Sequence, residues 1–281
     1  MSRLIPALAM SLLLAARTVA APFDVPIDPN PSTLYFELCI AGSCDTDSSS
    51  VTGTVTIDLD SIENPAWILL YDFDMQLTDD LYWNISWGIL GNLDATATGV
   101  VMRYATPGTP MGPNSITGGQ FAFIDVPTDM QGLLTYNATG LPCASLLSAG
   151  WPCNDTRNLA DEGTQLADEF AGTVSVQNRI VSLTSSIDVT TPLDPNNPGL
   201  GTFRVYGTVY GQTYVPLPGD FDDDGDVDLI DHATFFECMN GPEATNPPAP
   251  CDPADFDAAD LDADNDVDLA DYAAFSENFT G

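Results

Sequence analysis

Apolar and polar residues alternate along much of the chain, and this pattern gives the first indication of its structure. Residues 54–59 place Val, Ile and Leu at every second position with Thr and Asp between them, as a strand with one buried face requires. Comparable stretches, rich in β-branched and aromatic residues, cover residues 34–40, 68–77, 98–104, 120–126, 132–137 and 174–189. A further stretch, residues 203–214, is the clearest. It places Phe203, Val205, Gly207 and Val209 on one face and Tyr206, Tyr210 and Tyr214 on the other.

Clusters of Gly and Pro separate these stretches, for example at residues 106–110 and 194–199. A helical period is weak in this region except over residues 158–170, where it favours a helix. About ten short strands in one unit predict a mainly β fold, an antiparallel β-sandwich or barrel. We place this β-rich domain at residues 22–215.

The pattern changes after residue 215. Residues 216–219 read Pro-Leu-Pro-Gly, which suits a short, stiff linker and not the interior of a helix. Charge changes at the same place: residues 219–281 hold 16 Asp, 3 Glu and no Arg, a charge of −19, whereas residues 22–218 hold 18 Asp, 4 Glu and 4 Arg, a charge of −18. The sequence therefore predicts a separate domain at residues 220–281.

This C-terminal domain contains one acidic twelve-residue segment twice, at residues 220–231 and 260–271, each followed by a short helical pattern. Calcium prefers six to eight oxygen ligands, and a twelve-residue loop supplies them from positions 1, 3, 5, 7, 9 and 12, with position 7 acting through its carbonyl. All six positions are aspartate in both segments. The predicted ligands of two calcium ions are Asp220, Asp222, Asp224, Asp226, Asp228 and Asp231 in the first loop, and Asp260, Asp262, Asp264, Asp266, Asp268 and Asp271 in the second.

Other loop positions agree with this interpretation. Gly225 and Asn265 occupy the turn position, where a positive φ is expected. Val227 and Val267 occupy position 8, where we expect them to pair the two loops through a small shared sheet. An acidic, solvated tail would not repeat a ligand register in this way. Magnesium fits less well, because it uses fewer protein ligands and keeps its water.

Asp closes each loop where an ordinary EF-hand has Glu, and the prolines before residue 220 leave no entering helix. In these features, and in its duplication, the segment 220–281 resembles a dockerin domain, the EF-hand-type calcium module of many secreted bacterial proteins. The resemblance implies docking onto a cohesin-type protein partner, often in assemblies for polysaccharide catabolism, and hence a non-catalytic attachment role. Loop positions 10 and 11, commonly polar in dockerins, are Leu229-Ile230 and Leu269-Ala270 here.

Residues 1–20 predict a signal peptide, with Arg3 before an apolar run and small residues at its end. No later apolar stretch is long enough to cross a membrane, so we expect a secreted protein, extracellular or at the cell surface, without membrane insertion. Six cysteines in an exported chain favour disulfides, and although fifteen connectivities exist, proximity favours Cys39–Cys44, Cys143–Cys153 and Cys238–Cys251. A zinc site is disfavoured, because His232 is the only histidine and there is no CxxC pair.

Composition excludes several functions. The formal net charge is −35 and the chain has no lysine, so a nucleic-acid partner or an anionic membrane surface is excluded. Residues 22–215 contain no histidine, so a Ser-His-Asp or Cys-His nucleophile cannot form there. Two other chemistries stay open in this domain: a carboxylate pair for glycoside cleavage from residues such as Glu37, Glu63, Glu162 and Glu169, and a sugar-stacking platform from Trp67, Trp83, Trp87 and Trp151. Such acids more often lie solvated on the surface, and such tryptophans more often lie in a core.

The sequence thus favours a secreted, non-enzymatic protein whose β domain is attached through a calcium-dependent docking module. The alternative is an extracellular carbohydrate-active protein, a glycoside hydrolase or a sugar-binding domain, carried by the same module. A third interpretation is a cell-surface structural protein that uses calcium for rigidity alone. A deep cleft with two facing carboxylates would favour the enzyme, whereas an open aromatic face would favour sugar binding.

Overall fold

The structure is a computed structural model that describes residues 22–280 except 63, 195 and 223, with the side chains of residues 162 and 166–169 also outside it. The expected signal peptide at residues 1–20 lies outside the described residues. Among the described residues, no helix is long and apolar enough to cross a membrane.

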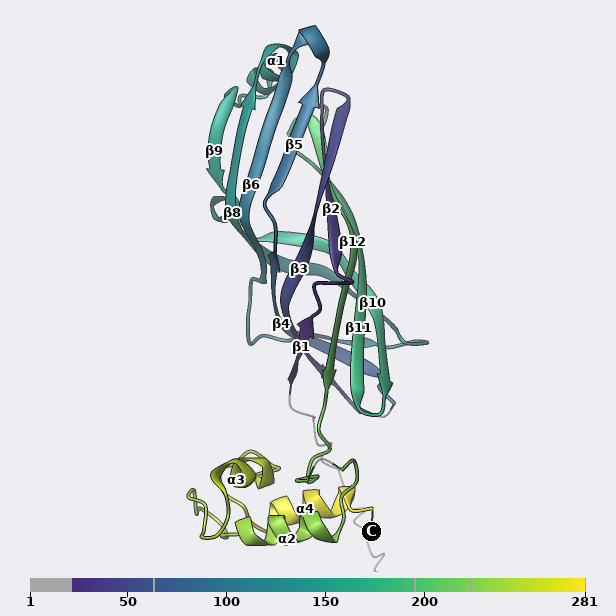
Figure 1. The fold of residues 1–281 in the computed structure, drawn as a ribbon, viewed down its shortest axis with the longest axis vertical. Coiled ribbons are helices and arrows are strands. Elements are labelled where there is room, and N and C mark those ends of the chain that lie inside the picture. Colours follow the sequence, from purple (N-terminus) through teal and green to yellow (C-terminus); the bar gives the residue numbers. More distant parts are fainter. Residues whose placement is uncertain (1–21, 63, 195, 223, 281) are drawn as a thin grey trace, which may run out of the picture.

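The described part of the larger domain contains twelve strands, all paired antiparallel (Figure 1). They are β1 (Phe23–Ile27), β2 (Thr33–Ile40), β3 (Ser43–Leu59), β4 (Trp67–Leu77), β5 (Leu81–Ser86), β6 (Asn92–Tyr104), β7 (Met111–Ser115), β8 (Gln120–Ala138), β9 (Asn154–Asn158), β10 (Gln165–Gln177), β11 (Ile180–Pro192) and β12 (Gly201–Tyr214). The prediction of a mainly β, antiparallel fold followed by a small helical part is confirmed.

The strand pairings close into a ring. Passing from β3 through β2, β12, β11, β10, β8, β6 and β4, each strand pairs with the next, and β4 pairs again with β3. The short strands β1 and β2 occupy one position in this ring, because each pairs with both β3 and β12. The long strand β3 therefore pairs with β2 and then with β1 along one of its edges.

The predicted alternation of faces is present in these strands. In β5, Leu81, Trp83 and Ile85 are buried and the residues between them are exposed. On β12, Phe203 and Val205 pack against the core, whereas the ring of Tyr206 stacks on Tyr35 with a centroid separation of 5.2 Å. Alternation of this kind places one continuous apolar core inside the ring of strands.

Side chains complete the sheet where backbone pairing stops. The N–H groups of Tyr82 and Asn84 on β5 donate to the carboxylates of Asp47 and Asp45 on β3, both at 2.7 Å. These charged acceptors satisfy the free edge of β5.

The expected helix at residues 158–170 is wrong. Residues Leu159–Glu162 form a 3-10 turn, η2, and the chain then enters β10. The ladder between β10 and β8, which pairs residues from Gln165 onward, provides backbone partners that outweigh a weak helical period. The described residues of this domain also include one α-helix, α1 (Gly140–Ser148), and a second 3-10 turn, η1 (Gly88–Leu90), neither of which was expected.

The C-terminal part contains α2 (Leu229–Cys238), α3 (Pro253–Ala259) and α4 (Leu269–Asn278). Its buried residues form a second core, separate from that of the strands: Val227, Phe235, Cys238, Phe256, Ala259, Val267 and Phe275. All three predicted disulfides are present, and Cys238–Cys251 joins the end of α2 to the segment before α3. Two cores agree with the division of the chain near residues 216–219.

The linker residues contact both parts. Arg179, in the turn between β10 and β11, donates to the carbonyl oxygens of Val215 and Pro216 at 2.8 and 2.7 Å. Leu217 packs against the second core, and Asn278 donates to the carbonyl of Pro218 at 3.2 Å. Hydrogen bonds from side chains to its carbonyl oxygens, together with the packing of Leu217, fix the path of the linker at each of its ends.

Candidate metal centre

The first acidic loop folds back over its first residue. The carboxylate of Asp220 accepts from the N–H groups of Asp224 and Gly225 at 3.2 and 3.0 Å, and Asp224 accepts from the N–H of Asp226 at 3.2 Å. Gly225 has φ +97°, in the region that glycine adopts without strain. The glycine at this position therefore allows the turn that brings both ends of the loop together.

Asp231, at position 12, closes the loop and begins the helix that follows. Its side chain is 1% exposed and accepts from the N–H groups of Phe221 and Asp228 at 2.6 and 2.8 Å. Asp228 is the N-cap of α2, and the two residues form a capping box. The positive end of the helix dipole lies at this point and stabilises carboxylates.

The second loop repeats the same bonds. Asp260 accepts from Asp264 and Asn265 at 3.1 and 2.9 Å, and Asp271, fully buried, accepts from Leu261 and Asp268 at 2.7 and 2.8 Å. Asn265 takes the place of Gly225 with φ +72°. Each bond lies within 0.1 Å of its counterpart in the first loop. The two sequence repeats are therefore also repeats of structure.

The carboxylates converge in four groups, two in each loop, with ligand atoms within 4.8 Å of one another. Asp231 and Asp271 belong to both groups of their loops. The groups are Asp220, Asp222 and Asp231; Asp226, Asp228 and Asp231; Asp260, Asp262 and Asp271; and Asp266, Asp268 and Asp271. The structure thus brings ten of the twelve predicted ligands together, whereas Asp224 and Asp264, at position 5, lie outside the groups and accept from the loop backbone.

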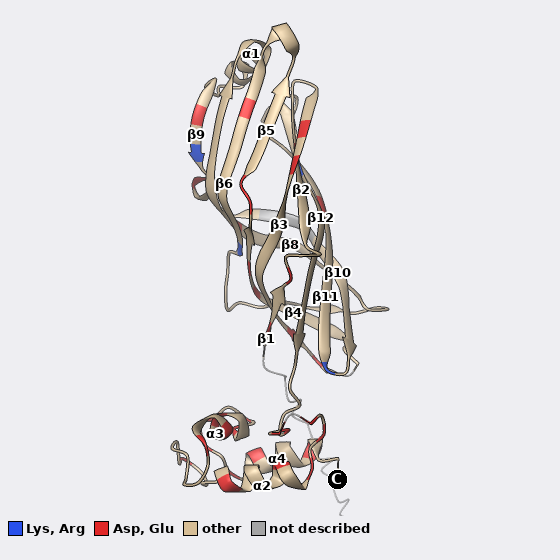
Figure 2. Ribbon diagram, in the orientation of Figure 1, with Lys and Arg blue, Asp and Glu red and all other residues tan. Residues whose placement is uncertain are grey.

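The electrostatics of these groups are unfavourable without a cation. Desolvation and the charge of Asp224 raise the pKa of Asp222, and Asp224, followed by desolvation, raises the pKa of Asp226. Residues 219–281 contain no Lys or Arg that could balance the charge, and Figure 2 shows the acidic residues of the helical part without any basic ones among them. Like charges this close favour protonation or a bound cation.

Asp266 gives a second, independent indication of a missing partner. Asp266 is 5% exposed; one oxygen accepts from the N–H of Glu243 at 2.5 Å, and the other, Oδ1, is buried and has no hydrogen-bond partner among the described residues. Buried carboxylate oxygens are normally paired or bound to metal. Aspartate oxygens are the ligands that calcium prefers, so these loops fit a calcium ion better than a softer metal.

Val227 and Val267, at position 8, are fully buried, but they do not pair with each other as expected. The carbonyl of Val227 accepts from the N–H of Thr280 at 2.9 Å, and that of Val267 accepts from Asn240 and Gly241 at 3.0 Å. Each loop is therefore bonded to the segment that follows the other helix. Asn240 and Thr280 stand forty residues apart, so the spacing of the repeat was the signal that could have identified them.

The described residues of the β domain do not show either arrangement of the carbohydrate-active alternative. Trp83 is 2% exposed and donates to the carbonyl of Phe36 at 2.8 Å, so it is a core residue, and Trp67, Trp87 and Trp151 are all partly buried. The apolar cavity in this domain has no Asp or Glu among its described lining residues, and a second, polar hollow has Asp129 as its one described acidic residue. Glu63 and the side chains of Glu162 and Glu169 lie outside the described part, and Glu37 lies on β2 opposite Arg204.

Comparison with known proteins leaves the structure as the main guide to function. A scan against protein-family models gave no match, and searches of curated proteins and of solved structures gave none either.

Proposed function

We propose that the chain is a secreted, non-enzymatic protein whose C-terminal module binds two calcium ions and attaches the β domain to a protein partner. The observation that carries the proposal is the pair of matching loops, in which one buried aspartate joins both carboxylate groups of its loop. In each loop, the side chains of positions 1, 3, 9 and 12 and the carbonyl of position 7 would hold the ion. The carboxylate of position 7, which belongs to one of the two groups, would be a further oxygen ligand. A bound ion would neutralise groups that otherwise repel.

Exposed apolar side chains on the module support a role in attachment. Leu229 and Leu269, the first residues of α2 and α4, are 73% and 75% exposed, and Ile230 and Phe236 are also exposed. The two helices are positioned by the loops that precede them, so calcium binding would set the geometry of this surface. Apolar residues on an acidic module suit a protein partner of the cohesin type.

Three disulfides, found at all six cysteines, support an extracellular location for this protein. No observation on the described residues favours the glycoside hydrolase or the sugar-binding domain over this proposal.

Attachment can be tested by pull-down with the immobilised protein from the culture medium and cell surface of its source, with calcium or with chelator. We expect one saturable partner to bind in calcium and to be released by chelator. The double variant Leu229→Asp, Leu269→Asp should lose this partner while still binding two calcium ions, because neither side chain is a ligand. Leu133→Asp, at an exposed leucine on β8, is the matched control. Equal capture by the double variant, or capture unaffected by chelator, contradicts the proposal.

A further inference from the structure

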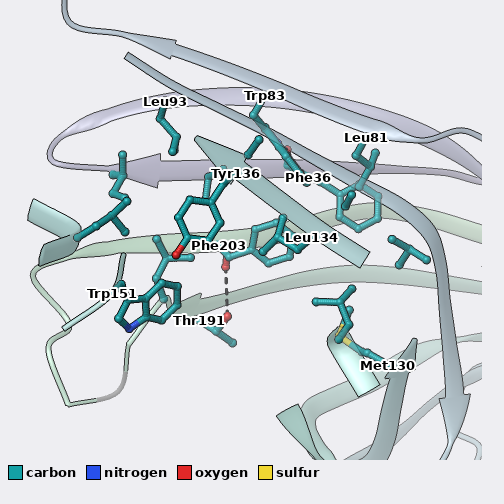
Figure 3. Close-up of a pocket in the computed structure, with 18 of the residues that line it drawn as sticks. Phe36, Leu81, Trp83, Leu93, Met130, Leu134, Tyr136, Trp151, Thr191 and Phe203 are labelled. Atoms are coloured by element: carbon teal, nitrogen blue, oxygen red, sulfur yellow. Dashed lines mark hydrogen bonds between the residues drawn. The ribbon is translucent and has the colours of Figure 1, made fainter. Parts of the chain in front are cut away.

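The β domain contains an apolar cavity between two layers of strands. One wall is formed by β5, β6 and β8, and the other by β2, β11 and β12. The cavity volume is about 260 Å³. Figure 3 shows side chains from both walls, among them Phe36, Leu134 and Phe203, that converge on this space.

The registers of the strands explain why this space is open. β10 pairs with β11 only as far as Ser185, so residues 186–192 of β11 have β12 on one side and no described strand on the other. On the opposite layer, β9 pairs with β8 alone. The partly exposed lining residues Trp151 and Leu159 come from the segments on either side of β9, and the exposed lining residues Thr191 and Pro192 come from the unpaired end of β11. The mouth of the cavity lies between them.

The lining determines the chemistry of an occupant. None of its described residues carries a charge, and their buried polar atoms are already bonded within the protein. Trp83 donates to Phe36, the Tyr136 hydroxyl donates to the carbonyl of Pro152 at 3.2 Å, and Thr191 donates to the carbonyl of Phe203 at 3.4 Å. These three donors are already used within the protein and most of the lining is apolar, so contacts with apolar surface must hold a ligand.

The volume of the cavity and the net charge of the chain restrict the class of ligand further. Cavities of about 150 Å³ with apolar walls bind a molecule such as benzene, whereas this space is larger but too small for a helix or a strand of a partner. The formal charge of −35 on the chain repels anionic amphiphiles from its surroundings. An uncharged molecule is therefore favoured over a fatty acid anion of the same chain length.

We propose that this cavity is a binding site for a small, uncharged hydrophobic molecule with an alkyl chain or an aromatic ring. The site is independent of the acidic loops, because its lining residues all lie between Phe36 and Phe203. Trp83 and Trp151 line it, so their fluorescence reports directly on an occupant.

The probe for the test is N-phenyl-1-naphthylamine, a neutral fluorophore, added to the full protein in calcium. We expect one saturable site, with energy transfer from tryptophan to the probe. We also expect 1-decanol to displace the probe at a concentration at least tenfold lower than decanoate does. Binding should be unchanged by chelator, which separates this site from apolar surface exposed by the C-terminal module.

Thr191→Trp should block the mouth and weaken probe binding at least tenfold. Thr190→Trp, at the adjacent exposed position outside the lining, is the matched control and should bind as the parent does. A second variant, Ala97→Phe, fills the cavity from β6 and should also weaken binding, while circular dichroism checks that it folds. Absence of saturable binding to the parent, equal binding by Thr191→Trp, or equal displacement by decanoate overturns the proposal.

Discussion

Phe235 and Phe275, which occupy equivalent positions of the two repeats, lie with their ring centroids 4.9 Å apart at the centre of the helical core. Each is fixed by the helix that follows its own acidic loop, and each loop is bonded to the segment that follows the other helix. The two loops, helices and rings therefore form one cooperative unit. A substitution in one loop should therefore also change the stability of the other loop.

The first prediction concerns the residues that close the loops. Asp231→Asn or Asp271→Asn removes a charged ligand shared by two carboxylate groups, so each variant should lose one calcium site. At a calcium concentration tenfold above Kd, one site contributes about 1.4 kcal/mol. Calcium should raise the free energy of unfolding of the helical module, followed by its helical circular dichroism signal. This rise should be smaller by about 1.4 kcal/mol in each single variant and should disappear in the double variant.

Asp257→Asn, at an exposed aspartate of α3 outside both loops, is the control and should keep the full calcium-induced rise. An undiminished rise in the Asp231→Asn, Asp271→Asn double variant contradicts the assignment of these two residues as ligands.

The second prediction concerns the β domain, which has its own core and none of the twelve predicted ligands. The midpoint of its unfolding, followed by the fluorescence of the four tryptophans, should be the same in calcium and in chelator. All four lie between residues 67 and 151, so the signal reports on this domain alone. A calcium-dependent midpoint would show that the two parts are energetically coupled through the linker.

The third prediction concerns Cys238–Cys251, which joins two cysteines 13 residues apart in the segment between the two acidic loops. Replacement of both cysteines by alanine should destabilise the helical module by about 3 kcal/mol in the chain-entropy account. The same replacement at Cys39 and Cys44, five residues apart, should cost the β domain about 2 kcal/mol. Chemical denaturation in calcium measures both, and an unaffected module in the first variant would count against this account.

The fourth prediction concerns Asp58 on β3, a fully buried carboxylate whose two oxygens have no hydrogen-bond partner among the described residues. Desolvation raises its pKa from 3.8 to about 6; the nearby backbone N–H of Leu59 opposes this rise, and the charge of Asp60 reinforces it. The folded state binds this proton more tightly than the unfolded state does. The contribution of Asp58 to the free energy of unfolding is therefore greatest below pH 4 and is lost as the pH rises through 6.

Between pH 4 and pH 8, this group should lower the free energy of unfolding of the β domain by about 2 to 3 kcal/mol. Asp58→Asn should remove the dependence, and it should be the more stable protein at pH 8. Asp125→Asn, at an exposed position of β8, should retain the dependence of the parent. Denaturant titrations at several pH values that show the same slope for Asp58→Asn and the parent would refute the assignment.

The acidic loops could be predicted from sequence because their chemistry is local. Twelve consecutive residues determine the ligands, the turn at Gly225 or Asn265, and the cap of the following helix. The disulfides were predictable for the same reason, since each joins cysteines within 13 residues. The β class followed from alternation, which also predicted the two faces of β12.

Features that depend on distant contacts could not be predicted. The residues around 158–170 have a weak helical period, yet the conformation of those in β9 and β10 is decided by pairing with β8. The stretch 174–189, which the sequence pattern presents as continuous, contains the turn between β10 and β11. Asn178 and Arg179 form this turn with φ +49° and +59°. The cavity requires side chains from six strands and from the segments around α1 and η2, so no single pattern indicates it.

Calorimetric titration of calcium into the protein from residue 22 onward, stripped of metal beforehand, tests the central claim most directly. The account predicts two sites per chain, with dissociation constants of about 10⁻³ M or tighter, as for extracellular calcium modules. Folding of the helical module should accompany binding, because its carboxylates repel one another without an ion. Fewer than two sites, or no heat of binding at millimolar calcium, would contradict it.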